Sequence, residues 1–131
     1  MTELHEEWME KAADDFKFAE VGLKEGFYSQ VCFLSQQVIE KSLKGCLVKL
    51  GRAYPKSHNL RELAQRVPEL SLKPYLERIT IMDGYYVPIR YPDAAPGMKA
   101  SGPPNQTEAT EALTTAKEIF DVVEKFLAHA P

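Results

Sequence analysis

The last quarter of the sequence carries the most regular helical period in the chain, and this period favours a fold built from helices. Apolar residues recur there at steps of three and four, at Ala109, Ala112, Leu113, Ala116, Ile119, Phe120, Val123, Phe126 and Leu127. This spacing places them on one face of an α-helix. Asn105 with Glu108, or Thr107, supplies a suitable helix start. We therefore expect a long amphipathic helix that buries one face.

Two more long helices are expected in the first half of the chain. The first runs from about Leu4 to Lys24, and its apolar face carries Trp8, Ala12, Phe16, Ala19 and Leu23. The second runs from about Tyr28 to Leu50 and stops at Gly51, because glycine adopts the left-handed conformation that ends many helices. The short link around Gly26 makes the two helices antiparallel neighbours.

Shorter helices and a loop are expected in the rest of the chain. Asn59, with Glu62 three residues later, has the spacing of a capping box, and Pro74 suits the first turn of a further helix. Residues 91–106 are rich in proline and glycine, which is typical of a surface loop. No segment alternates with a period of two. The expected fold is all-α, an up-and-down antiparallel four-helix bundle with an extra short helix, and residues 1–131 suit one domain.

Composition narrows the functional classes. A net charge of −3 argues against a generally basic nucleic-acid-binding protein, and no apolar run approaches the ~18–20 residues of a membrane span. Cys32 and Cys46 lie roughly 21 Å apart on one expected helix, which is too far for a disulfide. The N-terminal stretch lacks the basic and apolar regions of a signal peptide, so none is expected, and the sequence shows no metal-ligand spacing and no glycine-rich phosphate loop. We expect a cytoplasmic protein with no metal or other cofactor.

Polar residues interrupt the second expected helix. Gln37, Glu40, Lys41 and Lys44 share one side of this helix, and Gln36 flanks them. The simplest interpretation of this polar stripe is a solvated face with a Glu40–Lys44 pair at i, i+4 spacing. The apolar residues on both flanks of the stripe favour another interpretation, in which it lines a pocket or a subunit interface.

The segment YYVPIRYPD, residues 85–93, poses a similar choice. An ordinary solvent-facing position is one interpretation of Arg90. Aromatic and apolar residues flank it in the sequence at the start of the expected loop, however, which favours a binding role. A guanidinium group holds a phosphate through two parallel hydrogen bonds, and a ring such as Tyr91 stacks on a base. The residues expected to bind a ligand are Gln37, Lys41, Lys44, Arg90 and Tyr91.

Four motifs in order resemble the HEPN family, the higher-eukaryote and prokaryote nucleotide-binding domains. They are WMEKAADDFKFAE, GFYSQVCFLSQQVIEKSLKGCLVKLG, SHNLREL and YYVPIRYPD, and they span about Trp8 to Asp93. The resemblance implies a small helical bundle that forms a homodimer and acts in nucleotide or RNA biology. It also implies a small nucleotidyltransferase as a partner, and some such pairs are toxin–antitoxin systems.

The resemblance extends to individual residues. QQVIEKSLKG looks like the second-helix signature of the family, SHNL like its turn with His58, and RYPD like its arginine segment near the dimer cleft. Ribonuclease members place a histidine after an arginine, with four to six residues between. At those positions after Arg90 this chain has Ala95, Pro96 and Gly97. Because acid–base cleavage of RNA needs such a group, no catalytic residue is assigned.

Three hypotheses follow from the sequence. The first is a non-catalytic homodimeric module that binds a nucleotide, or a partner nucleotidyltransferase, beside Arg90, Lys41 and Lys44. The second is a toxin-type ribonuclease in which Arg90 holds phosphate and His58 is the base. The third is a structural dimer whose polar stripe is only an interface. The missing acid–base residues favour the first hypothesis over the second.

Overall fold

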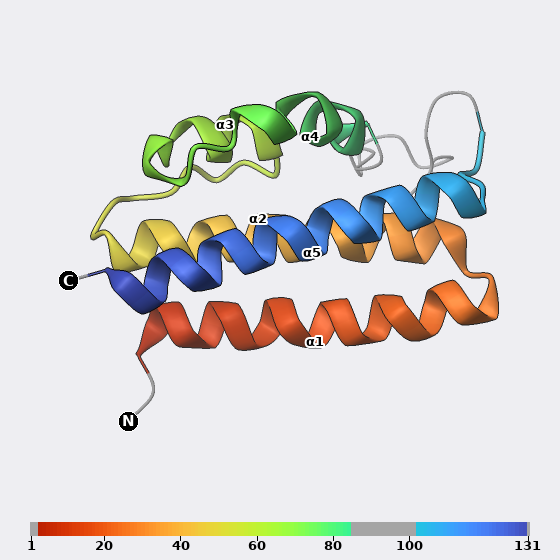
Figure 1. Ribbon diagram of the computed structural model, residues 1–131, viewed down its shortest axis with the longest axis horizontal. Helices are drawn as coiled ribbons and strands as arrows, with labels where there is room; N and C mark the ends of the chain where they lie inside the picture. Colours follow the sequence, from red (N-terminus) through yellow and green to blue (C-terminus); the bar gives the residue numbers. More distant parts are fainter. Residues whose placement is uncertain (1–2, 85–101, 131) are drawn as a thin grey trace.

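The computed structural model describes residues 3–84 and 102–130, and three long helices form its frame (Figure 1). They are α1 (Leu4–Glu25), α2 (Tyr28–Lys49) and α5 (Gln106–His129). α1 and α2 form an antiparallel hairpin, and α5 runs in the same direction as α2. The α2 helix packs against both of the others, whereas α1 and α5 touch less extensively.

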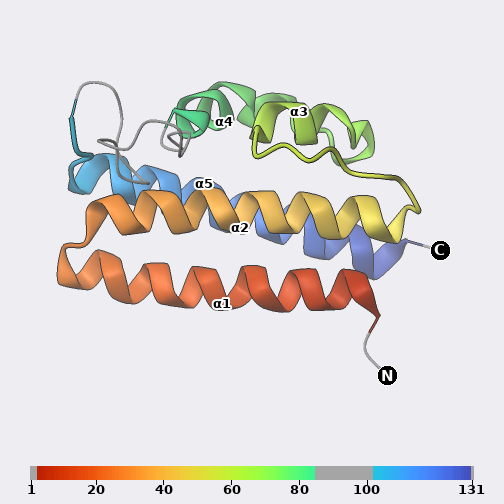
Figure 2. The ribbon, with the colours of Figure 1, turned by 180° about the vertical axis from the view of Figure 1, so that it is seen from behind.

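The chain between α2 and α5 forms a second layer of short elements. These are α3 (Leu60–Gln65), the 3₁₀ turns η1 (Pro68–Leu70) and η2 (Lys73–Tyr75), and α4 (Leu76–Asp83). Figures 1 and 2 show α3 and α4 on the side of α2 and α5 that faces away from α1. The predicted all-α class is confirmed, and the described residues contain no strand. Two short helices therefore take the place in the bundle where a fourth long helix would lie.

Local sequence signals fix the helix ends. α1 ends at Gly26, which has a φ of 84° that a residue with a Cβ adopts only under strain. Asn105 and Glu108 form a complete capping box at the start of α5. At α3 the Asn59 side chain accepts a hydrogen bond from the Glu62 amide, but the Asn59 amide donates to Ser57 Oγ. The capping box predicted at α3 therefore has the hydrogen bond to the Asn59 side chain, whereas the Asn59 amide binds Ser57 in place of Glu62.

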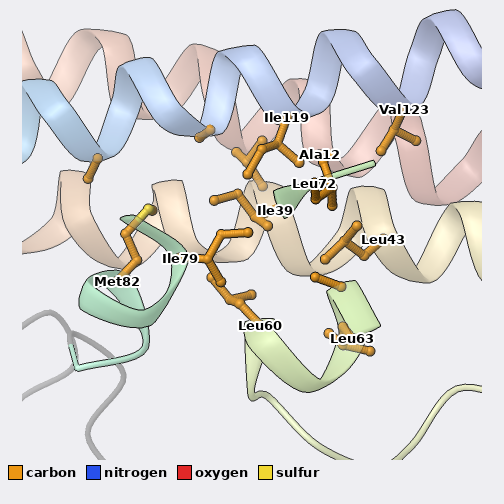
Figure 3. Close-up of a cluster of buried hydrophobic side chains, with 14 of the residues drawn as sticks. Ala12, Ile39, Leu43, Leu60, Leu63, Leu72, Ile79, Met82, Ile119 and Val123 are labelled. Atoms are coloured by element: carbon orange, nitrogen blue, oxygen red, sulfur yellow. The ribbon is translucent and has the colours of Figure 1, made fainter. Parts of the chain in front are cut away.

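The hydrophobic core lies where the two layers meet (Figure 3). Ile39 and Leu43 of α2 meet Leu60 of α3, Ile79 of α4 and Ile119 of α5, and all five side chains are fully buried. Each such side chain contributes roughly 1.5–3 kcal/mol relative to an exposed position. The helices of both layers therefore share one core.

A glycine allows α1 and α2 to pack closely. A Cβ at Gly45 would lie 3.1 Å from Trp8 Cβ and 3.3 Å from the carbonyl oxygen of His5. Both distances are shorter than ordinary carbon contacts. The small residue at this position allows the first two turns of α1, which carry His5 and Trp8, to pack against the second half of α2.

Two other expectations concern the cysteines and membranes. Cys32 and Cys46 are buried, and no disulfide joins them, which agrees with their predicted spacing. Over the ranges 3–84 and 102–130, none of the helices has the length and apolar character needed to cross a bilayer. Residues 91–101 of the predicted loop lie outside the described residues, and the remainder of that loop leads into the start of α5.

Candidate binding site

The polar stripe of α2 points into the protein. Gln36, Glu40 and Lys44 are buried, and Gln37 and Lys41 are partly buried. A solvated face is therefore not the correct interpretation of these residues. Buried charges are costly unless they are paired and hydrogen-bonded, so their partners decide what the stripe does.

Glu40 is the centre of a charged cluster. Its carboxylate lies 3.0 Å from Lys44 Nζ, and its two oxygens lie 3.0 and 3.1 Å from His58 Nδ1. The Glu40 and Lys44 side chains are 5% and 9% exposed, whereas the His58 side chain is 50% exposed. A buried carboxylate thus orients an imidazole that reaches the surface.

Two aromatic rings enclose the Lys44 ammonium group. Its Nζ lies 5.9 Å from the centre of the Trp8 ring and 5.4 Å from the centre of the Tyr54 ring. The two rings meet edge to face, with their centres 5.8 Å apart. Such cation–π contacts are each worth roughly 0.5–2 kcal/mol, more where water is excluded. The Trp8 side chain is partly buried, whereas Tyr54 is exposed.

The connection between α2 and α3 returns along α2, and two α2 residues hold it there. Gln36 Nε2 donates to the backbone oxygen of His58 at 3.0 Å, and Glu40, one turn further along, binds the His58 ring. Gln37 Nε2 donates to Gln36 Oε1 at 2.8 Å. Both the backbone and the side chain of His58 are therefore fixed by one face of α2.

The end of α4 adds a second carboxylate to this region. Asp83 accepts hydrogen bonds from the amides of Leu60 and Arg61, at 2.7 and 3.3 Å. Burial raises the pKa of Asp83 above its ordinary value, the two amides lower it in part, and the negative charge of Glu40 raises it further. Asp83 thus places the last turn of α4 beside the first turn of α3 and within the electrostatic reach of Glu40.

Of the five residues predicted to bind a ligand, Gln37 is hydrogen-bonded to Gln36, and the other four differ in what the structure shows of them. Lys44 belongs to the Glu40 cluster, and Lys41 pairs with Asp15 at 2.5 Å, so both ammonium groups have internal partners. Arg90 and Tyr91 lie outside the described residues. A phosphate-binding role for any of these four side chains stays a prediction.

The sequence did not reveal the role of three residues in or near the cluster. Trp8 was assigned only to an apolar stripe, and Tyr54 and Asp83 were assigned no role. The i, i+4 spacing of Glu40 and Lys44 was the one signal in the sequence for their pairing. No local pattern marks Tyr54 or Asp83, because the contact of Tyr54 with Lys44 depends on the path of the connection after α2, and Asp83 reaches the amides of Leu60 and Arg61 from the far end of α4.

One group of side chains has the composition of a metal site. Glu3, His5 and Glu6 bring potential ligand atoms within 4.8 Å of one another at the start of α1. The two carboxylates are exposed, and exposed acidic groups are common without a metal. This group therefore supports no assignment of a metal.

These features define a class, namely small all-α bundles in which a buried carboxylate on the second long helix holds a surface histidine. Residues 5–126 match the HEPN domain family, and the chain belongs to this family. No curated protein matches the sequence.

Two solved structures are similar over nearly their full length. ST0689, described as an archaeal HEPN homologue, is 29% identical, with a TM-score of 0.73 over 95% of this chain and 98% of its own. TT1696 from Thermus thermophilus is 31% identical, with a TM-score of 0.75 over 92% of this chain and 96% of its own.

Proposed function

We propose that this HEPN protein is a nucleotide-binding accessory module that works with a small nucleotidyltransferase. The observation that carries the proposal is the cluster in which buried Glu40 orients the surface imidazole of His58. A fold that needed only stability would gain little from a buried charged group, because apolar residues of similar volume serve as well. The imidazole fixed by Glu40 and the exposed Tyr54 ring, which contacts Lys44, instead offer a hydrogen-bonding group and a stacking face to a planar ligand.

The phosphate contact in this proposal falls mainly on Arg90. Lys41 and Lys44 already pair with Asp15 and Glu40, and a paired ammonium adds little net positive charge. Arg90 follows Gly84, the last described residue of this part of the chain, by six positions. A guanidinium group is suited to bidentate phosphate binding in a way that a lysine is not.

Calorimetric titration of ATP and other nucleotides tests the proposal. We expect micromolar affinity at best, and Arg90→Ala should weaken binding at least about tenfold, or ~1.4 kcal/mol. Arg66→Ala is a matched control, because this exposed arginine pairs with Glu62 on the surface of α3. If the wild-type protein binds no nucleotide at millimolar concentration, the proposal fails. If Arg90→Ala instead unfolds the protein, Arg90 has a structural role.

We also propose that the protein is a homodimer, as many HEPN domains are. Light scattering should report about twice the chain mass of 14.8 kDa. A strict monomer at tens of micromolar would contradict this part of the proposal. A dimer that binds neither nucleotide nor partner would favour the purely structural alternative, which the internal pairing of Lys41 and Lys44 also supports.

The Glu40–His58 contact favours one other candidate, a toxin-type ribonuclease. A carboxylate that holds the Nδ1 side of an imidazole is an arrangement found around general bases. The histidine spacing of the family's ribonucleases is nevertheless absent after Arg90. We therefore expect no metal-independent cleavage of single-stranded RNA. Cleavage by the purified protein that His58→Ala abolishes would replace the binding module with the ribonuclease.

A further inference from the structure

An open groove of about 420 Å³ runs along the seam between α1 and α5. Its floor is apolar. Met9 and Ala13 lie one turn apart on α1, and Phe120 and Leu127 lie two turns apart on α5. All four side chains are partly buried, so each still presents apolar surface to solvent. The groove exists because α1 and α5 both pack on α2 more closely than on each other.

The rim of the groove is acidic. Glu6 and Glu10 lie one turn apart on α1, Glu124 lies on α5, and all three are exposed. No lysine or arginine is among the described residues that line it. The nearby Lys117 already binds the Asp121 carboxylate, which raises its pKa, and the charges of Glu124 and Glu20 raise that pKa further.

The acidic rim belongs to a wider separation of charge in the molecule. α1 carries seven acidic and three basic side chains, and α5 carries five acidic and two basic ones. Residues 50–84, which form the other layer, carry six basic and four acidic side chains. The α1–α5 side therefore presents a negative potential around the apolar floor.

We propose that the α1–α5 groove is a docking site for a basic amphipathic helix of another protein. Apolar side chains at i, i+3, i+4 and i+7 of that helix occupy the floor, and its lysines and arginines face Glu6, Glu10 and Glu124. The lined part of α1 extends over residues 5–13, about 12 Å at 1.5 Å per residue, which matches roughly two helical turns.

A second copy of this chain fits the groove poorly. In a two-fold symmetric dimer the same patch meets itself, so each rim glutamate would face glutamates of the other copy. Like charges placed together across an interface oppose association. The groove also shares no residue with the Glu40 cluster, so the docking proposal does not depend on nucleotide binding.

Fluorescence anisotropy with a labelled synthetic helix tests the proposal. The probe is an amidated peptide of about 15 residues with leucines on one face and lysines elsewhere, long enough to form a helix once bound. We expect saturable binding that weakens with added salt, because screening reduces the charge term. Glu10→Lys with Glu124→Lys should weaken binding at least tenfold. Glu25→Lys with Glu111→Lys, an equal charge change on the same helices away from the groove, should change it less than about twofold.

The apolar floor needs its own variant. Met9→Gln keeps the length of the side chain and should weaken the peptide at least fivefold while the helical circular dichroism stays unchanged. A probe peptide with serines in place of its leucines should not bind. Nucleotide titrations of the groove variants should match those of the wild type, which separates this proposal from the proposed function.

Four results would overturn the docking site. The first is that the leucine peptide shows no saturable binding, and the second is that the control charge variant loses as much peptide affinity as the groove variant. The third is that the serine peptide binds as well as the leucine peptide, and the fourth is that Met9→Gln binds the peptide as tightly as the wild type. Sedimentation adds a fifth. If the wild type is a dimer that Glu10→Lys with Glu124→Lys dissociates, the groove is a self-interface and the basic helix is the wrong occupant.

Discussion

The ammonium group of Lys44 lies 3.0 Å from the Glu40 carboxylate, one helical turn away, with both side chains almost wholly buried. Removing one partner of such a pair leaves an uncompensated buried charge, which costs about 3–5 kcal/mol. Lys44→Met and Glu40→Gln should therefore each lower the free energy of urea unfolding by about this amount. The double variant should lose less than the sum of the two.

An exposed pair with the same spacing provides the control for this comparison. Lys117 and Asp121 of α5 lie 2.9 Å apart at the surface. Lys117→Met should leave the unfolding free energy almost unchanged, because solvent screens the pair and solvates either partner alone. An equal decrease in the unfolding free energy for Lys44→Met and Lys117→Met would show that burial does not increase the contribution of the Glu40–Lys44 pair to stability.

Gly45→Ala tests the close contact of α1 with α2. The new methyl group would meet Trp8 Cβ at 3.1 Å and the backbone oxygen of His5 at 3.3 Å. Overpacking of this kind costs roughly 1–3 kcal/mol, which should exceed the gain of about 0.5–1 kcal/mol in helix propensity. Thermal unfolding should show a lower midpoint. A higher midpoint would mean that the first turn of α1 moves away easily.

The raised pKa of Asp83 predicts a particular pH dependence. The folded protein binds the Asp83 proton more tightly than the unfolded chain does, so this group adds stability as the pH falls towards its ordinary value of 3.8. The wild type should therefore gain stability relative to Asp83→Asn between pH 7 and pH 4, as measured by urea unfolding. Asp83→Ala should cost about 1 kcal/mol at neutral pH, because α3 loses acceptors for its first amides. A difference between wild type and Asp83→Asn that does not vary with pH would refute this account.

Burial raises the pKa of the Cys46 thiol to about 11, with smaller effects from the charges of Glu69 and Arg52. Because only the thiolate reacts, the raised pKa alone slows alkylation at pH 8 by roughly a hundredfold. In a Cys32→Ala variant, iodoacetamide should label the native protein at least that much more slowly than the denatured chain. Rapid labelling in the native state would place Cys46 at the surface.

The helices were predictable because their signals are local. The predicted start of α2 at Tyr28 is the observed one, and its predicted end at Leu50 is one residue beyond the observed end at Lys49. Asn105 caps α5 as its spacing with Glu108 indicated. Period and caps determine where a helix lies, but they do not determine which long-range partners its polar residues meet.

The surroundings of the polar stripe on α2 could not be predicted from the sequence, as the Glu40 cluster shows. The spacing of the stripe was compatible with solvent, a pocket or an interface, and the choice depended on where the connection after α2 lies. That connection returns along α2 and brings Tyr54 and His58 to Lys44 and Glu40. The path of an irregular segment follows from contacts such as Gln36 with the His58 backbone, which no local pattern encodes.

The hydrogen bonds from Leu60 and Arg61 to Asp83 join the two ends of the segment that forms α3 and α4. Residues 60–83 are therefore closed into a loop that enters and leaves the bundle at one place, with the three long helices packed together beneath it. Such a unit is suited to open cooperatively without global unfolding. In native-state hydrogen exchange, the amides of α3 and α4 should share one opening free energy, lower than that of the amides in the middle of α2.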